Sequence, residues 1–226
     1  MNIFEDETKL LRLKLRLAQL QKVENSKNNF LDFVQAMWPE FILGNHHKTI
    51  AGKLEDIASG KIKRLIINMP PRHTKSEFAS FLFPAWMIGR DPAMKIIQAT
   101  HTTELAVNFG RKVKNGDLII IDDPHSEQTA LSNNGFDQAW DWYTGGPRQR
   151  LQPGGSIVLV QTRWSEKDMT GQLIRAQAKD PIADQWEIVE LPALMPSGNP
   201  CWPEFWSKDE LMGVKASVPA YKWNAQ

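Results

Sequence analysis

Residues 65–78 read LIINMPPRHTKSEF, and this segment contains the pattern from which the fold can be inferred. An apolar, β-branched run is followed by a turn with two prolines, and Lys75 and Ser76 then begin a stretch with helical spacing. A helix start presents unpaired backbone N–H groups and the positive end of the helix dipole, which favour a phosphate group. A lysine at this point can reach the β- and γ-phosphates of a nucleoside triphosphate, and a serine can ligate Mg²⁺. The segment therefore predicts a phosphate-binding loop between a strand and a helix.

The loop departs from the common pattern G-x-x-x-x-G-K-[ST], because Met69 and Thr74 occupy the glycine positions. We expect Pro70 and Pro71 to stiffen a turn that glycine would otherwise permit. Arg72 adds a guanidinium group that can donate two hydrogen bonds to phosphate oxygens. A Pro-Pro turn followed by a capped helix, with no ligand, is the alternative interpretation of the same residues.

A second segment, LIIIDDPH, places Asp122 and Asp123 directly after an apolar strand at residues 118–121. Ligands bind at the carboxyl ends of the strands in open parallel sheets. We expect Asp122 to hold Mg²⁺, directly or through water, and Asp123 to polarise the attacking water. The alternative is that the two aspartates cap a helix or begin a turn before Pro124.

A third segment, VLVQTRWSEKDMTG, brings Gln161 and Thr162 to the same sheet edge, where both could lie near the γ-phosphate. Arg163 either faces the nucleotide or pairs with Glu166 or Asp168. A plain strand end, followed by a helix capped at the serine of TRWS, is the alternative interpretation.

Strands alternate with helices along the chain, and the central strands are apolar throughout. This pattern is typical of strands buried on both faces, so we predict an α/β fold with a doubly wound, mostly parallel sheet. The first segment has the leucine spacing of an amphipathic helix that either packs on its own domain or docks a partner, and residues 24–29 resemble a linker. We expect further helices at residues 46–58, 75–87, 103–114, 136–142 and 166–178, strands at 63–69, 94–100, 118–121, 156–162 and 186–192, and a turn at 153–155.

The composition excludes several classes of protein. With 42% hydrophobic and 23% charged residues, the 226-residue chain is neither disordered nor repetitive. The formal net charge is +1, so any contact with nucleic acid must come from a local patch. The single cysteine, Cys201, excludes an internal disulfide framework and fits a reducing compartment. No apolar run approaches the ~20 residues that span a bilayer, and no signal core is present, so we expect a soluble intracellular protein.

The three segments, in this order, resemble the ATPase domain of the large terminases of tailed bacteriophages, the motors that package DNA. The resemblance extends from about Phe30 to the end of the chain. PPRHTKSE resembles the family's phosphate loop, LIIIDDP its metal-binding strand, and VLVQTRWSEKDMTG its coupling motif, with Thr162 at the coupling position. FILGNHHKTI resembles the adenine-side segment and places His46 near the base, with His47 as the alternative and helix capping as the non-ligand role of both.

The resemblance implies a P-loop NTPase domain of the RecA-like (ASCE) class over residues 30–226, preceded by an N-terminal helix and linker at residues 1–29. The cofactors implied are ATP and Mg²⁺. The residues implied to bind ATP are Pro71, Arg72, His73, Thr74, Lys75, Ser76 and His46. Those implied to act in catalysis are Asp123, Lys75 and Arg72; in coupling, Gln161 and Thr162; and in metal binding, Ser76 and Asp122.

Two departures from the family concern whole segments. The family carries several dozen residues, including an arginine in a G-R-G-like turn, before the metal-binding strand. Here Asn115 runs directly into Gly116 and Asp117, which resemble the stub of that turn. The family also continues into an RNase H-like nuclease whose acidic cluster cannot be assigned here, so we expect no nuclease activity from this chain.

Arg148 and Arg150 are candidates for contacting a neighbouring subunit's nucleotide or DNA phosphates, and plain surface arginines are the alternative.

The implied function is ATP-driven packaging of double-stranded DNA into a procapsid through its portal. The implied partners are the portal protein, the small terminase subunit, double-stranded DNA and further copies of the chain in a ring, with no membrane. The implied location is the host cytoplasm, with transient docking on the portal and absence from the mature virion. A helicase-like, nucleic-acid-stimulated ATPase is the alternative enzyme. A non-catalytic scaffold that keeps the nucleotide fold is the alternative of another class, which the intact Lys75, Ser76, Asp122 and Asp123 disfavour.

Overall fold

A computed structural model describes residues 3–100, 115–132 and 134–224 of the chain. The chain divides into two compact units, Met1–Phe41 and Ile42–Gln226. The helix expected at residues 103–114 lies outside the described residues. No helix in the described ranges is both long and apolar enough to cross a membrane.

The first unit consists of two helices, α1 (Ile3–Asn28) and α2 (Phe30–Met37). Asn29 caps the second helix, because its side chain accepts a hydrogen bond from the backbone N–H of Asp32 at 2.9 Å. Helix α1 continues through residues 24–28, which we expected to form a linker. The polar residues of that stretch are compatible with an exposed helix and carry neither proline nor glycine, so nothing in them breaks the helix.

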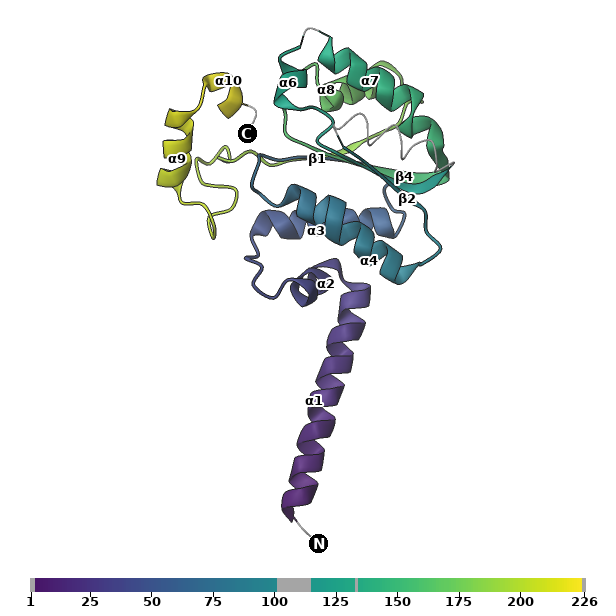
Figure 1. The fold of residues 1–226 in the computed structure, drawn as a ribbon, viewed down its shortest axis with the longest axis vertical. Helices are drawn as coiled ribbons and strands as arrows, with labels where there is room; N and C mark the ends of the chain where they lie inside the picture. The colour runs from purple at the N-terminus through teal and green to yellow at the C-terminus, as the bar shows by residue number, and fades with distance from the viewer. Residues whose placement is uncertain (1–2, 101–114, 133, 225–226) are drawn as a thin grey trace. The chain divides into compact units, whose positions relative to one another are not determined.

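The second unit is built on a five-stranded parallel sheet with the strand order β2-β3-β4-β1-β5 (Figure 1). The strands are β1 (Arg64–Asn68), β2 (Ile96–Thr100), β3 (Gly116–Asp122), β4 (Leu151–Gln161) and β5 (Glu187–Glu190). Every pairing is parallel, so the carboxyl ends of all five strands lie along one edge. The predicted α/β fold of the RecA-like P-loop class is therefore confirmed.

Helices cover both faces of the sheet (Figure 1). On one side lie α3 (Asn45–Ala58) and α4 (Phe83–Arg90), which continues from the π-helix η1 (Glu77–Leu82). On the other side lie α6 (Glu127–Ala130), α7 (Gly135–Gly145) and α8 (Met169–Lys179). The remaining described helices are the 3-10 helix η2 (Pro147–Arg150), α9 (Lys208–Ser217) and α10 (Ala220–Trp223).

The central strands are buried on both faces, as their continuous apolar sequence predicted. In β1, β3 and β4 the residues Leu65, Ile66, Ile119, Ile120 and Val158 are all fully buried. One sheet face forms a core with α7 and α8, to which Tyr143, Met169 and Leu173 contribute. The middle positions of a strand enclosed in this way are apolar, because each side chain meets one of the two helical layers.

Three local expectations for the second unit were wrong. The turn expected at residues 153–155 lies within β4, whose register against β3 jumps from Leu151 opposite Gly116 to Ser156 opposite Leu118. Residues 153–155 thus form a bulge in β4, in which Gly154 has φ 79°. Gly116 and Asp117, expected to be a turn stub, begin β3.

The third wrong expectation concerns the start of helix α8. Helix α8 begins at Met169 rather than at residue 166, and its cap is Asp168 rather than Ser165. Serine and aspartate are both strong N-cap residues, so the sequence alone does not choose between them.

Replacing a buried isoleucine of β3 should destabilise the second unit strongly. Ile119→Ala removes a fully buried side chain and leaves a cavity between helical layers, so we expect the free energy of unfolding to fall by about 2–5 kcal/mol in urea titrations. Ile182→Ala is the matched control, because Ile182 is 92% exposed. A loss of similar size in both variants would contradict the position of the core.

Candidate nucleotide site

The phosphate loop connects β1 to η1 and adopts the left-handed backbone that glycine usually supplies. Arg72 has φ 60° and Thr74 has φ 62°. Thr74 is therefore at a true glycine-like position, as the pattern indicated, whereas Met69, at the other expected glycine position, is a buried residue outside this region. Pro71 and Arg72 are exposed, so the Arg72 guanidinium is accessible to a phosphate.

Lys75 joins the ends of two other strands. Its Nζ lies 2.9 Å from Asp123 Oδ2 and donates to Thr162 Oγ1 at 2.7 Å. The backbone N–H of Thr162 in turn donates to Asp123 Oδ1 at 2.7 Å. Lys75 is only 7% exposed, so this triangle of polar groups replaces the water around its ammonium group.

Ser76 and Asp122 lie together as the metal-site interpretation requires. Ser76 Oγ donates to Asp122 Oδ1 at 3.0 Å. Burial raises the pKa of Asp122, and the hydrogen bond from Ser76 and the charge of Lys75 oppose this shift only in part. One hydroxyl and one carboxylate fit Mg²⁺, which takes most of its remaining ligands from phosphate oxygens and water. In the described part of the chain no group of three His, Cys, Asp or Glu residues could hold a metal by itself.

Asp123 has a strained backbone. Its φ is 43°, a conformation that costs a residue other than glycine on the order of 1–3 kcal/mol. The contacts of both carboxylate oxygens, together with the 2.8 Å hydrogen bond from its own N–H to Val160 O, hold it there. The two adjacent carboxylates have different partners, since Asp122 accepts from Ser76 whereas Asp123 contacts Lys75 and Thr162.

The phosphate loop is hydrogen-bonded to His47. From the sequence, this residue was expected only as the alternative to His46 near the adenine base. His47 accepts a hydrogen bond from the N–H of Gly44 at its Nδ1 (2.9 Å), so its Nε2 carries the proton and donates to Thr74 Oγ1 at 2.7 Å. The Thr74 hydroxyl then donates to His73 O at 2.6 Å. His47 therefore both caps α3 and fixes the left-handed residue of the loop.

His46 and His73 lie in the same buried cluster. The rings of His46 and His47 have centroids 3.7 Å apart, and His46 also contacts Trp202 edge-on at 5.4 Å. Burial is the main cause that lowers the pKa of His46 to about 4 and of His47 to about 3, and it also lowers the pKa of His73. His46, which we expected beside the adenine, is 3% exposed and surrounded by aromatic rings.

Three other residues singled out from the sequence have side-chain partners within the chain. Gln161 is buried and donates through Nε2 to Thr170 Oγ1 at 2.8 Å. Arg148 forms two hydrogen bonds with Asp184, at 2.7 and 3.3 Å, and Arg64 lies 3.0 Å from the same carboxylate. Of the two alternatives for Arg163, pairing with Asp168 is the one observed, at 2.9 Å.

Comparison with solved structures gives remote likenesses. No family model and no curated protein matches the chain. It is similar to domain III of the replication initiation protein DnaA from Thermotoga maritima (15% identity, TM-score 0.42, covering 82% of this chain and 78% of that one). It is also similar to AMPPCP-bound DnaA from Aquifex aeolicus (15%, 0.39, 68% and 49%) and to DnaA bound to AMPPCP and single-stranded DNA (13%, 0.41, 79% and 53%). In the last two cases the chain spans about half the length of the solved structure.

The buried histidines should make the protein sensitive to mild acid. The folded pKa of His47, about 3, is below the unfolded value of 6.5, so its contribution to stability is complete above pH 6.5 and is lost as the pH falls toward 3. At pH 5 the loss from this group alone should approach about 2 kcal/mol.

We expect His47→Gln, which keeps a donor for Thr74, to lose less stability than the unmodified protein between pH 7 and pH 5. Urea unfolding at the two pH values measures the difference. Equal losses in the two proteins would contradict a buried, neutral His47.

Proposed function

We propose that this chain hydrolyses ATP at the carboxyl edge of its sheet, with Mg²⁺ held by Ser76 and Asp122. The observation that carries the proposal is the convergence of four side chains from separate segments: Lys75 and Ser76 after β1, and Asp122 and Asp123 at the end of β3. A capped helix or a plain turn would not require the lysine to be buried against an aspartate from another strand.

The chain's own residues divide the chemistry between them. Lys75 has three N–H donors, of which two contact Asp123 and Thr162, so one remains for an oxygen of the transferred phosphoryl group. Arg72, exposed in the loop, can neutralise charge on the same group. Mg²⁺, when bound, supplies further positive charge at the phosphate oxygens.

Asp123 is suited to orient the attacking water. Each of its carboxylate oxygens already accepts one contact, from Thr162 N–H and from Lys75, and each retains a lone pair for a water hydrogen. Thr162 contacts both Lys75 and Asp123, so a change at the γ-phosphate would be transmitted to the end of β4. This position fits the coupling role that the family resemblance implies.

The two adjacent aspartates should fail differently when each is replaced by asparagine. Asp122→Asn should weaken Mg²⁺-dependent nucleotide binding and hydrolysis together. Asp123→Asn should preserve binding and slow the chemical step by a factor on the order of 10² or more. Fluorescent-nucleotide titration and single-turnover hydrolysis measure the two effects. Lost affinity in Asp123→Asn with retained affinity in Asp122→Asn would reverse the assignment.

We further propose that hydrolysis drives the packaging of double-stranded viral DNA into a procapsid, as in a large terminase. The support is the order and the amino-acid sequences of three segments, PPRHTKSE, LIIIDDP and VLVQTRWSEKDMTG. Each of them contributes a residue to the site, namely Lys75, Asp123 and Thr162. The partners would be the portal protein, a small terminase subunit, double-stranded DNA and further copies of this chain in a ring. The setting would be the host cytoplasm, with docking on the portal.

A packaging assay tests this proposal. The protein, mixed with portal-bearing procapsids and ATP, should protect double-stranded DNA from added nuclease, and Lys75→Met should protect none. Methionine is the matched replacement because Lys75 is 7% exposed and a chain of similar length keeps the packing. Hydrolysis stimulated by single-stranded nucleic acid, with no response to portals, would instead favour the helicase-like alternative.

A further inference from the structure

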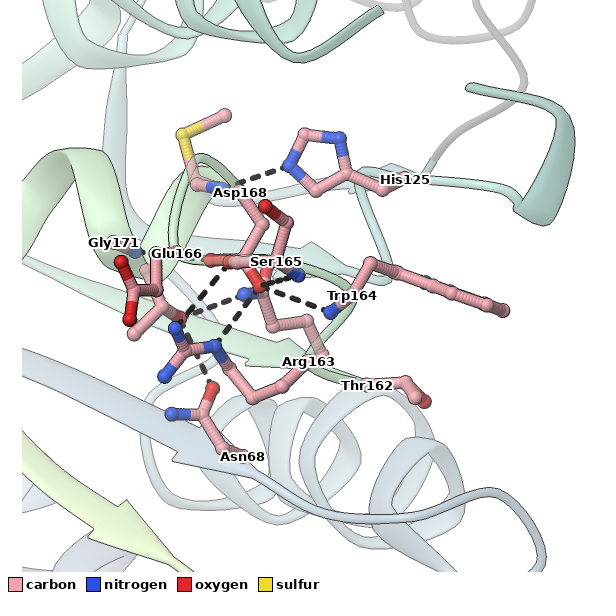
Figure 2. Close-up of polar contacts among 12 residues, drawn as sticks. Asn68, His125, Thr162, Arg163, Trp164, Ser165, Glu166, Asp168 and Gly171 are labelled. Atoms are coloured by element: carbon pink, nitrogen blue, oxygen red, sulfur yellow. Dashed lines mark hydrogen bonds and ion pairs between the residues drawn. The ribbon is translucent and has the colours of Figure 1, made fainter. Parts of the chain in front are cut away.

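The start of α8 forms hydrogen bonds with residues at or just after the ends of three different strands. Figure 2 shows the cluster, in which the side chain of Asp168 lies at the centre of the contacts from residues 163–171. The three strands concerned, β1, β3 and β4, are those whose carboxyl ends carry the phosphate loop, the aspartate pair and Thr162.

Asp168 ties the segment after Thr162 to the helix. Its Oδ2 accepts from Arg163 Nε at 2.9 Å and from Trp164 N at 3.1 Å, and its Oδ1 accepts from Gly171 N at 3.0 Å. The side chain is 0% exposed, so the Arg163 guanidinium is the positive partner of a fully buried carboxylate. Figure 2 shows the Arg163 side chain folded back toward Asp168.

Two neighbours of Asp168 hold the other strand ends. Thr170 Oγ1 donates to Oδ1 of Asn68, the last residue of β1, at 3.0 Å. The N–H of Met169 donates at 2.8 Å to Nε2 of His125, which lies two residues after Asp123. Burial lowers the pKa of His125 to about 4, so this ring stays neutral and keeps its acceptor nitrogen.

We propose that Asp168 is a positioning residue, which holds Thr162 against Lys75 and Asp123 by fixing the backbone that follows it. The proposal deepens the proposed ATPase function. Asp168 makes no contact with the phosphate loop itself among the described residues, so its effect should be on the alignment of the reacting groups and much less on nucleotide affinity.

An ordinary helix cap bonds only within its own helix. Ser207 caps α9 through contacts with Glu210 alone, three residues away in its own helix. Asp168 instead uses one oxygen for its own helix and the other for residues that precede it, next to Thr162. The second oxygen, Oδ2, therefore holds the segment that follows Thr162.

Asp168→Ser separates these two roles. Serine is as good an N-cap as aspartate, so α8 keeps its first turn, but a short neutral side chain cannot hold Arg163 and Trp164 as well. We expect hydrogen exchange at the Thr162 amide, which donates to Asp123, to become about tenfold faster or more. The amides of β1 should keep their original rates.

Asn29→Ala is the matched control. It removes an N-cap from α2 in the other unit and should leave exchange at Thr162 unchanged. Unchanged exchange at Thr162 in a folded Asp168→Ser would overturn the proposal. If that variant fails to fold, Arg163→Ala removes the partner of the same oxygen from a half-buried position and is judged by the same measurement.

Kinetics provides the second readout. In Asp168→Ser the affinity for a fluorescent ATP analogue should stay within about threefold of the original, while single-turnover hydrolysis slows about tenfold or more. Equal losses of affinity and rate would indicate a merely structural role and contradict the proposal. Absence of hydrolysis in the unmodified protein would refute the proposed function, and the exchange measurement would still decide the role of Asp168.

Discussion

The buried ammonium group of Lys75 is the constraint on which the site depends. Removing a charge from water is costly unless polar and charged partners replace the lost hydration. Those partners, Asp123 and Thr162, come from the ends of β3 and β4, whereas Lys75 follows β1. The three strand ends must therefore keep their mutual register for the lysine to remain buried. The sheet supplies that register, since residues 64–68 of β1 pair in order with residues 157–161 of β4.

The fold could largely be predicted from the sequence because its central strands are continuous apolar runs. Burial on both faces favours apolar residues in the middle of a strand, and the runs containing Ile66, Ile119 and Val158 show this pattern in the sequence itself. The helix starts and turns were less predictable. Pro153 and Gly154 have the composition of a turn, but the structure accommodates them as a bulge in β4. Local residue preference cannot reveal a partner strand that tolerates such an interruption.

At the site, the pattern identified the residues and not their contacts. Lys75, Ser76, Asp122 and Asp123 were found because a lysine and a serine at a helix start, and acids at a strand end, have a known chemical use. Nothing in the spacing indicated that Lys75 would be buried. The support from His47 was equally hidden, because a histidine at the start of a helix has many uses, and its hydrogen bond to Thr74 joins residues 27 positions apart.

The glycine-free phosphate loop has a thermodynamic consequence. Thr74 occupies a backbone conformation that is strained for any residue with a Cβ, at a cost on the order of 1 kcal/mol or more. Glycine would remove that strain, but it would also raise the conformational entropy of the unfolded chain. The larger entropy lost on folding would cost a comparable free energy. Pro70 and Pro71 reduce the freedom further. The loop is therefore strained but rigid. Because its shape is already fixed, little conformational entropy of the loop is lost when a ligand binds.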